Sequence, residues 1–196
     1  MEERSRWTMH WDEVSVFDGN AVSLGVEEVD LMRAAGESLA REASAMTTGM
    51  VLFLCGPGNN GGDGFVAACS ESLSGRSAVV ASRPESNTDA SSHARSIAEE
   101  SPGVHVWPSM PEGDWELVVD CMLGAGGDGP GYPLRGPISE MSDWARSLSV
   151  PVLACDIPTG MGGPDCLRAS RTLTFHSTKS GMSLEDCGAI LVSDLP

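Results

Sequence analysis

The sequence has little of what would assign it to several common classes of protein. Lysine is nearly absent: only one of the 12 basic residues is a lysine, and the 28 acidic residues bring the formal net charge to −16. That charge repels nucleic acid and anionic membrane surfaces, so we expect neither as a partner. An acidic, lysine-poor surface is also compatible with life at high salt, where screening weakens self-repulsion.

No run of 18 apolar residues is present, so the chain offers no candidate for a membrane-spanning helix. The first ten residues, MEERSRWTMH, contain no apolar core of a secretory signal, which predicts a cytoplasmic protein. The six cysteines form no CxxC pair, and three of them end apolar runs, which favours buried thiols over disulfides or zinc. G-x-S-x-G, a P-loop with G-K-[ST] and HExxH are missing, so hydrolase, NTPase and zinc-protease interpretations lack their motifs.

The arrangement of apolar residues predicts one α/β domain over 1–196. A helical segment over 11–45 contains two helices with a break near Gly25, and an α/β core over 50–194 follows. Strands are expected over 50–55, 77–82, 104–107, 117–120, 151–155, 172–175 and 189–192, with crossover helices around 62–74, 88–100 and 137–149. This alternation predicts a three-layer αβα, Rossmann-like sandwich with a mostly parallel central sheet.

The strongest motif is VLFLCGPGNNGGDGF, residues 51–65, in which a strand leads into a glycine-rich turn and then a helix beginning near Gly62. Glycines let the backbone approach a ligand closely, and the free N–H groups at a helix start favour a phosphate. The turn formally contains G-x-G-x-x-G, but the second strand ends near Arg83 instead of at the acidic residue that a classical dehydrogenase uses for a ribose. Arg83 could meet a 2′-phosphate. The polar side chains of the turn, Asn59, Asn60 and Asp63, indicate a more specialised site than one for pyrophosphate alone.

Two further strands end in polar, turn-rich segments. Asp120 is followed by CMLGAGGDGPGYPLRGP, which carries Arg135, and Asp156 begins DIPTG. Ligands bind outside the carboxyl ends of parallel strands, so these segments can converge with the first turn in one crevice. Asn60, Asp120 and Thr159 would then supply oxygens that suit a monovalent or other hard cation.

Two roles are open for each of these aspartates. Asp120 is either part of such a site or a carboxylate that caps a loop. Asp156 follows an apolar strand in a turn bounded by proline and glycine, so it is either a proton-transfer group with a shifted pKa or a residue that stabilises the turn.

The motifs GPGNNGGDG, DCMLGAG with the later LRGP, and DIPTG followed by TLTFHSTKSG resemble, in order and spacing, the YjeF N-terminal-domain family, the NAD(P)H-hydrate epimerases. The resemblance implies an enzyme that interconverts the R and S epimers of NADH or NADPH hydrated at C6, in nicotinamide cofactor repair. Asp156 would be its catalytic acid/base. It also implies potassium held by Asn60, Asp120 and Thr159. The residues that would bind the substrate are Asn59, Asn60, Gly61, Gly62, Asp63, Gly124, Ala125, Gly126, Gly127, Asp128, Gly129, Pro130 and Asp156.

The sequence departs from the family pattern in three places. Arg33 and Ala34 stand where many members have Glu-Asn, the loop between Gly124 and Arg135 is longer than usual, and the kinase-like dehydratase domain of many relatives is not in this chain. We therefore expect an ADP- or ATP-dependent hydrate dehydratase on another chain as the functional partner. Lys179 either lines the site or is an ordinary surface lysine, and a homodimer is a possible assembly.

The sequence leaves two alternatives to an epimerase. One is a non-catalytic YjeF-type module that binds or scaffolds other molecules, against which Asp156 and the charge of −16 both argue. The other is an NAD(P)-dependent dehydrogenase, which would need a ribose-binding acidic residue and a recognisable substrate domain.

Overall fold

A parallel seven-stranded sheet forms the centre of the protein, for which a computed structural model describes residues 7–126 and 129–195. The strands are β2 (Met50–Cys55), β3 (Ser77–Ala81), β4 (Val104–Trp107), β5 (Trp115–Cys121), β6 (Val152–Cys155), β7 (Arg171–Phe175) and β9 (Ala189–Ser193). They lie in the order β4-β3-β2-β5-β6-β7-β9, and every neighbouring pair is parallel. The predicted α/β class is confirmed, and the seven predicted strands match within one or two residues at either end.

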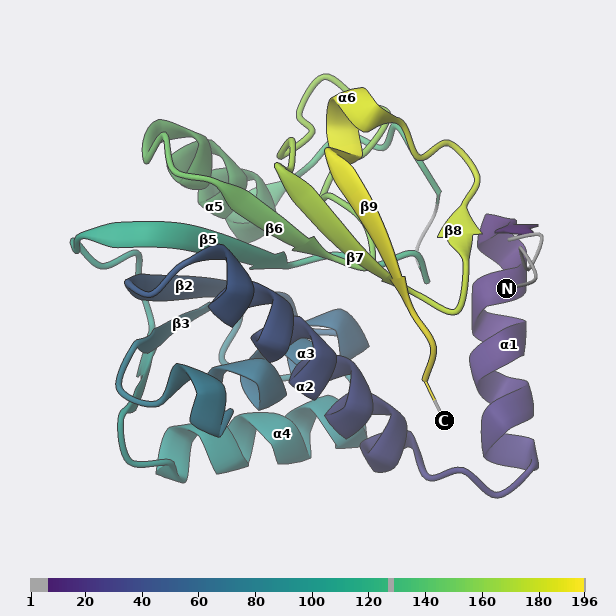
Figure 1. Cartoon of the computed structure of the whole chain (residues 1–196), viewed down its shortest axis with the longest axis horizontal. Coiled ribbons are helices and arrows are strands. Elements are labelled where there is room, and N and C mark those ends of the chain that lie inside the picture. The colour runs from purple at the N-terminus through teal and green to yellow at the C-terminus, as the bar shows by residue number, and fades with distance from the viewer. Residues whose placement is uncertain (1–6, 127–128, 196) are drawn as a thin grey trace.

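Helices cover both faces of this sheet (Figure 1). One face carries α2 (Glu28–Met46), α3 (Asn59–Ala68) and α4 (Asp89–Glu100), and the opposite face carries α5 (Gly136–Ser147). Successive side chains of a strand point to opposite faces, so Val51 and Phe53 of β2 pack toward α2 and α3, whereas Leu52 and Leu54 pack toward α5. Burial on both faces explains why the strands read as nearly continuous apolar runs.

The order of the strands reverses beside β2. From β2 the chain moves outward to β3 and β4, and it then returns to place β5 on the other side of β2. The backbone N–H of Gly56 donates to the carbonyl of Cys121 at 3.0 Å, which joins the segments that leave these two strands. Such a switch point opens a crevice at the carboxyl ends of the strands, which is where the motifs of the sequence lie.

The N-terminal segment combines the predicted first helix with a short pair of strands that the sequence did not reveal. β1 (Thr8–Met9) pairs in parallel with β8 (Thr178–Lys179), and α1 (Trp11–Ser23) follows at the side of the molecule (Figure 1). The Trp11 indole N–H donates to the carbonyl of Ser180 at 2.9 Å. The predicted break between the first two helices is confirmed at Gly25, whose φ is +94°.

The helix after the glycine-rich turn begins earlier than predicted. The sequence indicated a start near Gly62 and a helix over 62–74, but α3 begins at Asn59 and ends at Ala68. Gly58 precedes it in an extended conformation, so both asparagines belong to the first helical turn. A short 3₁₀ helix (Glu71–Leu73) and the four-residue α6 (Leu184–Cys187) complete the described elements.

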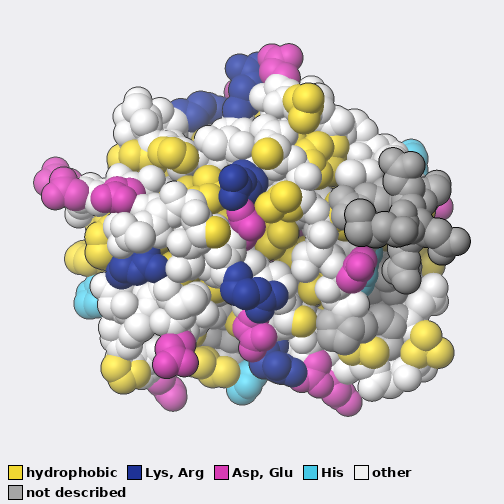
Figure 2. All heavy atoms as spheres, viewed as in Figure 1, with side chains coloured by type: hydrophobic (Ala, Val, Ile, Leu, Met, Phe, Trp, Pro, Cys, Tyr) yellow, Lys and Arg dark blue, Asp and Glu magenta, His cyan; other side chains and the backbone are white. Residues whose placement is uncertain are grey.

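All six cysteines are free thiols, and five of them are buried, as predicted. Within residues 7–126 and 129–195, no helix combines the length and apolar character needed to cross a bilayer. Figure 2 shows that acidic side chains are spread over the face it presents, several of them next to basic ones. The negative charge of the protein is therefore distributed and not concentrated in one patch of this face.

Candidate functional site

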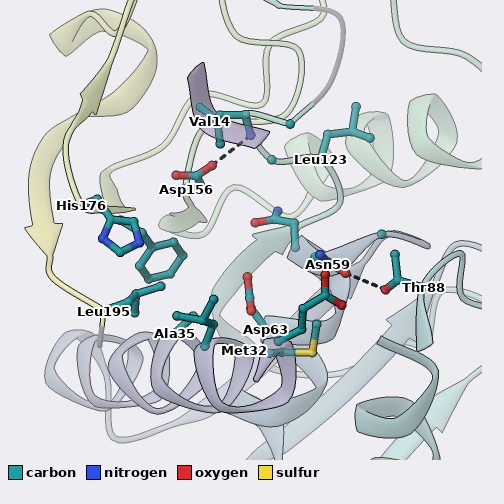
Figure 3. A pocket seen from close by; sticks show the side chains of 18 of the residues that line it. Val14, Met32, Ala35, Asn59, Asp63, Thr88, Leu123, Asp156, His176 and Leu195 are labelled. Carbon is teal, nitrogen blue, oxygen red and sulfur yellow. Dashed lines mark hydrogen bonds between the residues drawn. The ribbon is translucent and has the colours of Figure 1, made fainter. Parts of the chain in front are cut away.

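A cavity of about 590 Å³ lies at the switch point, where β2, β5, β6 and β7 end. Asn59, Asn60 and Asp63 of α3 line it together with Asp156, the residue that follows β6. Figure 3 shows Asp63 and Asp156 on opposite sides of the cavity, with His176 to one side and Leu123 to the other. Segments far apart in the sequence therefore share one space, as the parallel sheet predicts.

The glycine-rich turn is packed too closely for side chains at two positions. A Cβ on Gly56 would lie 1.8 Å from the carbonyl oxygen of Met122, and one on Gly61 would lie 1.9 Å from the carbonyl oxygen of Gly56. Both contacts are with backbone atoms, which cannot swing away as the tip of a side chain can. The glycines thus let β2 turn directly into α3 and keep the turn against the segment that follows β5.

Polar contacts hold the first turn of α3. The Thr88 hydroxyl donates to the Asn59 side-chain oxygen at 2.6 Å (Figure 3). The buried Asp63 carboxylate lies 3.9 Å from the sulfur of Cys155, a thiol whose pKa burial raises to about 12 and which therefore stays neutral. Asp63 thus places its side chain at the wall of the cavity, beside a neutral thiol.

Asp156 is held in a backbone conformation uncommon for a residue with a side chain. Its φ is +65°, and its amide N–H donates to the carbonyl of Leu173 on β7 at 2.7 Å. Aspartate tolerates this left-handed region better than most residues, and such conformations cluster at functional sites. The sharp turn aims the carboxylate into the cavity, where it is 8% exposed.

Three donors fix the Asp156 carboxylate. The Ala125 backbone N–H donates to one oxygen at 2.9 Å. The other oxygen accepts from the Thr174 hydroxyl at 3.0 Å and from the Lys179 ammonium at 2.6 Å. Asp156 is therefore part of a buried ion pair and not a solvated turn residue.

Lys179 is buried, contrary to the surface alternative that the sequence left open, and is 3% exposed. Besides Asp156, its ammonium donates to the Thr174 hydroxyl and to the carbonyl of Phe175, both at 2.8 Å. An ammonium has three N–H donors, so these three acceptors engage all of them. Lys179 also lies on β8, which β1 pairs with through Met9.

The ion pair determines the ionisation of Asp156. Burial acts to raise the pKa of the carboxyl, but the Lys179 charge and the hydrogen bonds from Ala125 and Thr174 outweigh it and hold the pKa below its ordinary value. Asp156 is consequently a carboxylate at neutral pH. The site can take up a proton at this group and release it again.

Asp120 and Thr159 form a second buried polar centre. The Thr159 N–H and hydroxyl donate to the two Asp120 oxygens at 2.7 and 2.8 Å, and the Thr159 oxygen accepts from the N–H of Leu123 at 3.2 Å. Burial raises the pKa of Asp120 to about 6 despite these hydrogen bonds. The Asn60 side chain lies close to Gly124, the residue after Leu123. A Cβ on Gly124 would be 3.2 Å from the Asn60 side-chain oxygen.

Some of the predicted substrate-binding residues line the cavity and others do not. Seven of them line the cavity: Asn59, Asn60, Asp63, Gly124, Ala125, Gly126 and Asp156. Gly61 and Gly62 are buried beneath the turn, Gly129 lines a neighbouring cavity, and Pro130 lies near Gly162. Gly127 and Asp128 lie outside the described residues. Arg33, which departs from the family pattern, is exposed and pairs with Asp30 and Glu37.

Sequence reasoning used three strand ends and missed the fourth. β7 also ends at this edge, and it contributes Thr174, Phe175 and the following turn with His176 and Lys179. The signal was present, because 172–175 was a predicted strand and its carboxyl end had to join the other strand ends. Lys179 is the only lysine of the chain, and its ammonium is buried against acceptors that come from β6 and β7 and their ends.

A doubly wound parallel sheet with glycine-rich turns and a cavity at its switch point defines a Rossmann-like α/β domain of the kind that binds ligands at the carboxyl ends of its strands. A family model described as "YjeF-related protein N-terminus" matches residues 28–181. The chain belongs to this family.

Curated relatives agree with this assignment. The chain is 30% identical to the bifunctional NAD(P)H-hydrate repair enzyme Nnr of Methanospirillum hungatei, over 94% of this chain and 39% of that protein. It is 37% identical to an NAD(P)H-hydrate epimerase of Rhodopirellula baltica, over 77% of this chain and 66% of that protein. The chain thus spans about two fifths of the bifunctional relatives that it matches.

Solved structures support the fold independently. The crystal structure of the yeast protein YNL200c superimposes with a TM-score of 0.74 at 19% identity, over 88% of this chain and 81% of that one. At this level of identity the likeness concerns the architecture of the domain alone.

Proposed function

We propose that this protein is an NAD(P)H-hydrate epimerase, which interconverts the R and S epimers of hydrated NADH and NADPH. The observation that carries the proposal is the Asp156 carboxylate, which is buried, ionised through Lys179 and directed into the cavity at the switch point. The printed names of the relatives, which are epimerases and bifunctional repair enzymes for this substrate, support it.

Because Asp156 is ionised, we favour a mechanism in which its carboxylate acts as a base in the first step. The substrate carries a hydroxyl on the ring carbon next to the ring nitrogen. The carboxylate takes the hydroxyl proton, the carbon–nitrogen bond breaks, the carbon becomes an aldehyde, and the nitrogen takes the proton back from Asp156. Asp156 removes this proton again as the nitrogen attacks the other face of the aldehyde, and it returns the proton to the new alkoxide oxygen. The ring thus closes with inverted configuration at the carbon, and Asp156 is left as a carboxylate. Loss of hydroxide would instead need a protonated acid first, which the lowered pKa disfavours.

Residues around Asp156 would orient this chemistry. Lys179 has no N–H left for the substrate, so its role is to keep Asp156 ionised and in place. Ala125 donates its N–H to the carboxylate oxygen that Lys179 does not contact, which holds the segment after β5 beside Asp156. The S epimer would then be consumed by an ADP- or ATP-dependent dehydratase, the partner that we propose in accord with the bifunctional relatives.

A coupled assay tests the proposal. Purified protein is incubated with an R/S mixture of hydrated NADH or NADPH and an S-specific dehydratase supplied as a separate protein, and reduced cofactor is followed by its absorbance. We expect recovery of the whole mixture. Recovery of the S portion alone, at the rate set by the dehydratase, would reject the epimerase and favour the non-catalytic alternative.

We also propose a potassium ion held by Asn60, Asp120 and Thr159. The donor set fits, because it consists of neutral oxygens and one carboxylate, which suits a monovalent cation. Asp120 is fully buried, and its described hydrogen-bond donors are all uncharged. The Asn60 amide nitrogen is buried with no hydrogen-bond partner among the described residues, so the Asn60 side chain is free to turn its oxygen toward an ion. A bound ion would supply positive charge beside Asp120 and the glycine-rich turn.

Potassium is therefore expected to stabilise the protein. At constant ionic strength, replacing N-methylglucamine by potassium should raise the melting temperature, since a ligand at 100 times its dissociation constant contributes about 2.7 kcal/mol. Asp120→Asn should abolish this response, whereas Asp114→Asn, the same change of charge at an exposed position, should keep it. Thermal unfolding in the two salts measures both. An identical melting temperature in the two salts for the unmodified protein contradicts the potassium site.

A further inference from the structure

A second cavity, of about 450 Å³, lies on the other side of the segment that follows β5. Leu123 and Gly124 line both cavities, so they form the partition between them. The lining of the second cavity is mostly apolar and includes Trp11, Ile157 and Met161. It also includes Tyr132 and Arg135, to which no role in the proposed reaction has been assigned.

The first cavity offers a phosphate the N–H groups at the start of α3, but little positive charge from side chains. The Asp156 carboxylate lines it, and a phosphate beside a carboxylate is unfavourable. Lys179 is already engaged by three acceptors. His176 has a pKa lowered by burial and by the charge of Lys179, so it carries no positive charge at neutral pH. A substrate with two nucleosides joined by a diphosphate therefore gains from a cationic side chain beyond the start of α3.

Arg135 offers such a place. Within the described part of the chain, its guanidinium has neither an ion pair nor a hydrogen bond, and it lines the second cavity. Elsewhere the arginines of this acidic protein are largely paired with carboxylates: Arg33, Arg95, Arg146, Arg168 and Arg171. Arg135 is exposed at the edge of the cavity. An arginine without a carboxylate partner in a chain of charge −16 is suited to bind an anion from outside the chain.

Two aromatic side chains flank the same cavity. The Trp11 indole is fixed by its hydrogen bond to Ser180 at 2.9 Å, and its ring lies 3.9 Å from where a Cβ of Gly129 would be. Tyr132 is 58% exposed, an unusual position for the only tyrosine of the chain. A flat heterocycle such as adenine stacks favourably on rings of this kind.

We propose that the second cavity binds the adenosine half of the substrate, with Arg135 contacting one of its phosphate groups and Tyr132 its base. The inference rests on the proposed function, which supplies a dinucleotide as substrate. The dinucleotide crosses the partition at Leu123 and Gly124, so that its nicotinamide half reaches Asp156 while its adenosine half lies in the second cavity. Ligand cavities have volumes of about 300–1,000 Å³, and the two cavities together provide the room that a dinucleotide needs.

Calorimetry with ADP-ribose and with 2′-phospho-ADP-ribose tests the inference without catalysis, because both probes lack the nicotinamide ring. We expect both to bind the unmodified protein. Arg135→Gln should weaken binding about 10–100-fold, the range for a lost hydrogen bond to a charged group. Tyr132→Ala should weaken it about 5–100-fold through lost stacking. Arg41→Gln, which removes the same charge at an exposed position that lines neither cavity, should leave both affinities unchanged.

The two probes identify the phosphate. Equal weakening of both by Arg135→Gln places the guanidinium at the diphosphate, and weakening of 2′-phospho-ADP-ribose alone places it at the 2′-phosphate. Affinities unchanged in both Arg135→Gln and Tyr132→Ala, or no binding to the unmodified protein at millimolar probe, overturn the inference. If the unmodified protein epimerises hydrates while these affinities stay unchanged, only the second cavity is wrong. If it binds the probes and does not epimerise, only the proposed function is wrong.

Discussion

Asp156→Asn is expected to lower the rate of epimerisation about 10²–10⁴-fold, the contribution of a well-placed proton-transfer group. The asparagine keeps the size of the side chain but cannot take a proton. It also cannot satisfy all its neighbours, because its NH₂ group must face either the Ala125 N–H or the Lys179 ammonium. Removing one partner of a buried ion pair costs about 3–5 kcal/mol, so the fold should persist with reduced stability.

Variants of Lys179 separate the chemistry from the stability. Lys179→Met leaves Asp156 buried without its cation, so the pKa of the carboxyl rises and activity should return only as the pH is raised. The double variant, Asp156→Asn with Lys179→Met, should recover at least half of the lost stability because no unpaired charge remains, but none of the activity. Urea unfolding and rates measured across pH distinguish these outcomes. Full activity in Asp156→Asn would show that another group is the acid/base.

The ion pair of Asp156 and Lys179 should also affect how the stability of the protein depends on pH in acid. The folded-state pKa of Asp156 is lower than its unfolded-state value of about 3.9, so the carboxylate contributes stability that is fully present above that value. This contribution is lost as the pH falls through the folded-state pKa. The double variant should lack this part of the acid-induced loss of stability.

Gly61→Ala is expected to have the largest effect on the structure of the site. The added methyl group would lie 1.9 Å from the carbonyl oxygen of Gly56 and 2.8 Å from its carbon, so the turn must open. Overpacking of this kind costs about 1–3 kcal/mol, and more where backbone and not side chain must move. Moving Asn59 and Asn60 should also weaken substrate binding, which a raised KM in the coupled assay would report.

Gly58→Ala provides the matched control for stability. A Cβ at Gly58 would meet no atom within 4 Å, and its φ of −93° is open to any residue. Gly58 is the N-cap of α3, where alanine is less favourable than glycine, so the free energy of unfolding should fall by no more than about 1 kcal/mol. Urea unfolding of both variants measures the difference. Equal stability of the two variants would mean that the turn is not packed as tightly as the structure has it.

Much of the fold could be predicted because its signals are local. Buried parallel strands read as apolar runs, so β2 and β4 were predicted with the bounds that they have. The two-residue strands β1 and β8 were missed because so short a segment carries no periodicity. The start of α3 was misplaced because glycine and asparagine have weak helical propensity, and here the packing of the turn overrides it.

By itself the sequence determined the class of the fold, the edge of the sheet at which the motifs meet, and the candidacy of Asp156. These follow from hydrophobic periodicity and from the rule that parallel strands bring their carboxyl ends to one side. Only the tertiary structure decided that Lys179 is buried against Asp156, that β7 contributes a fourth strand end, and that Arg135 lines a second cavity. The physical reason is that ionisation and burial depend on which groups meet across the fold, and neither is encoded in the spacing of residues along one segment.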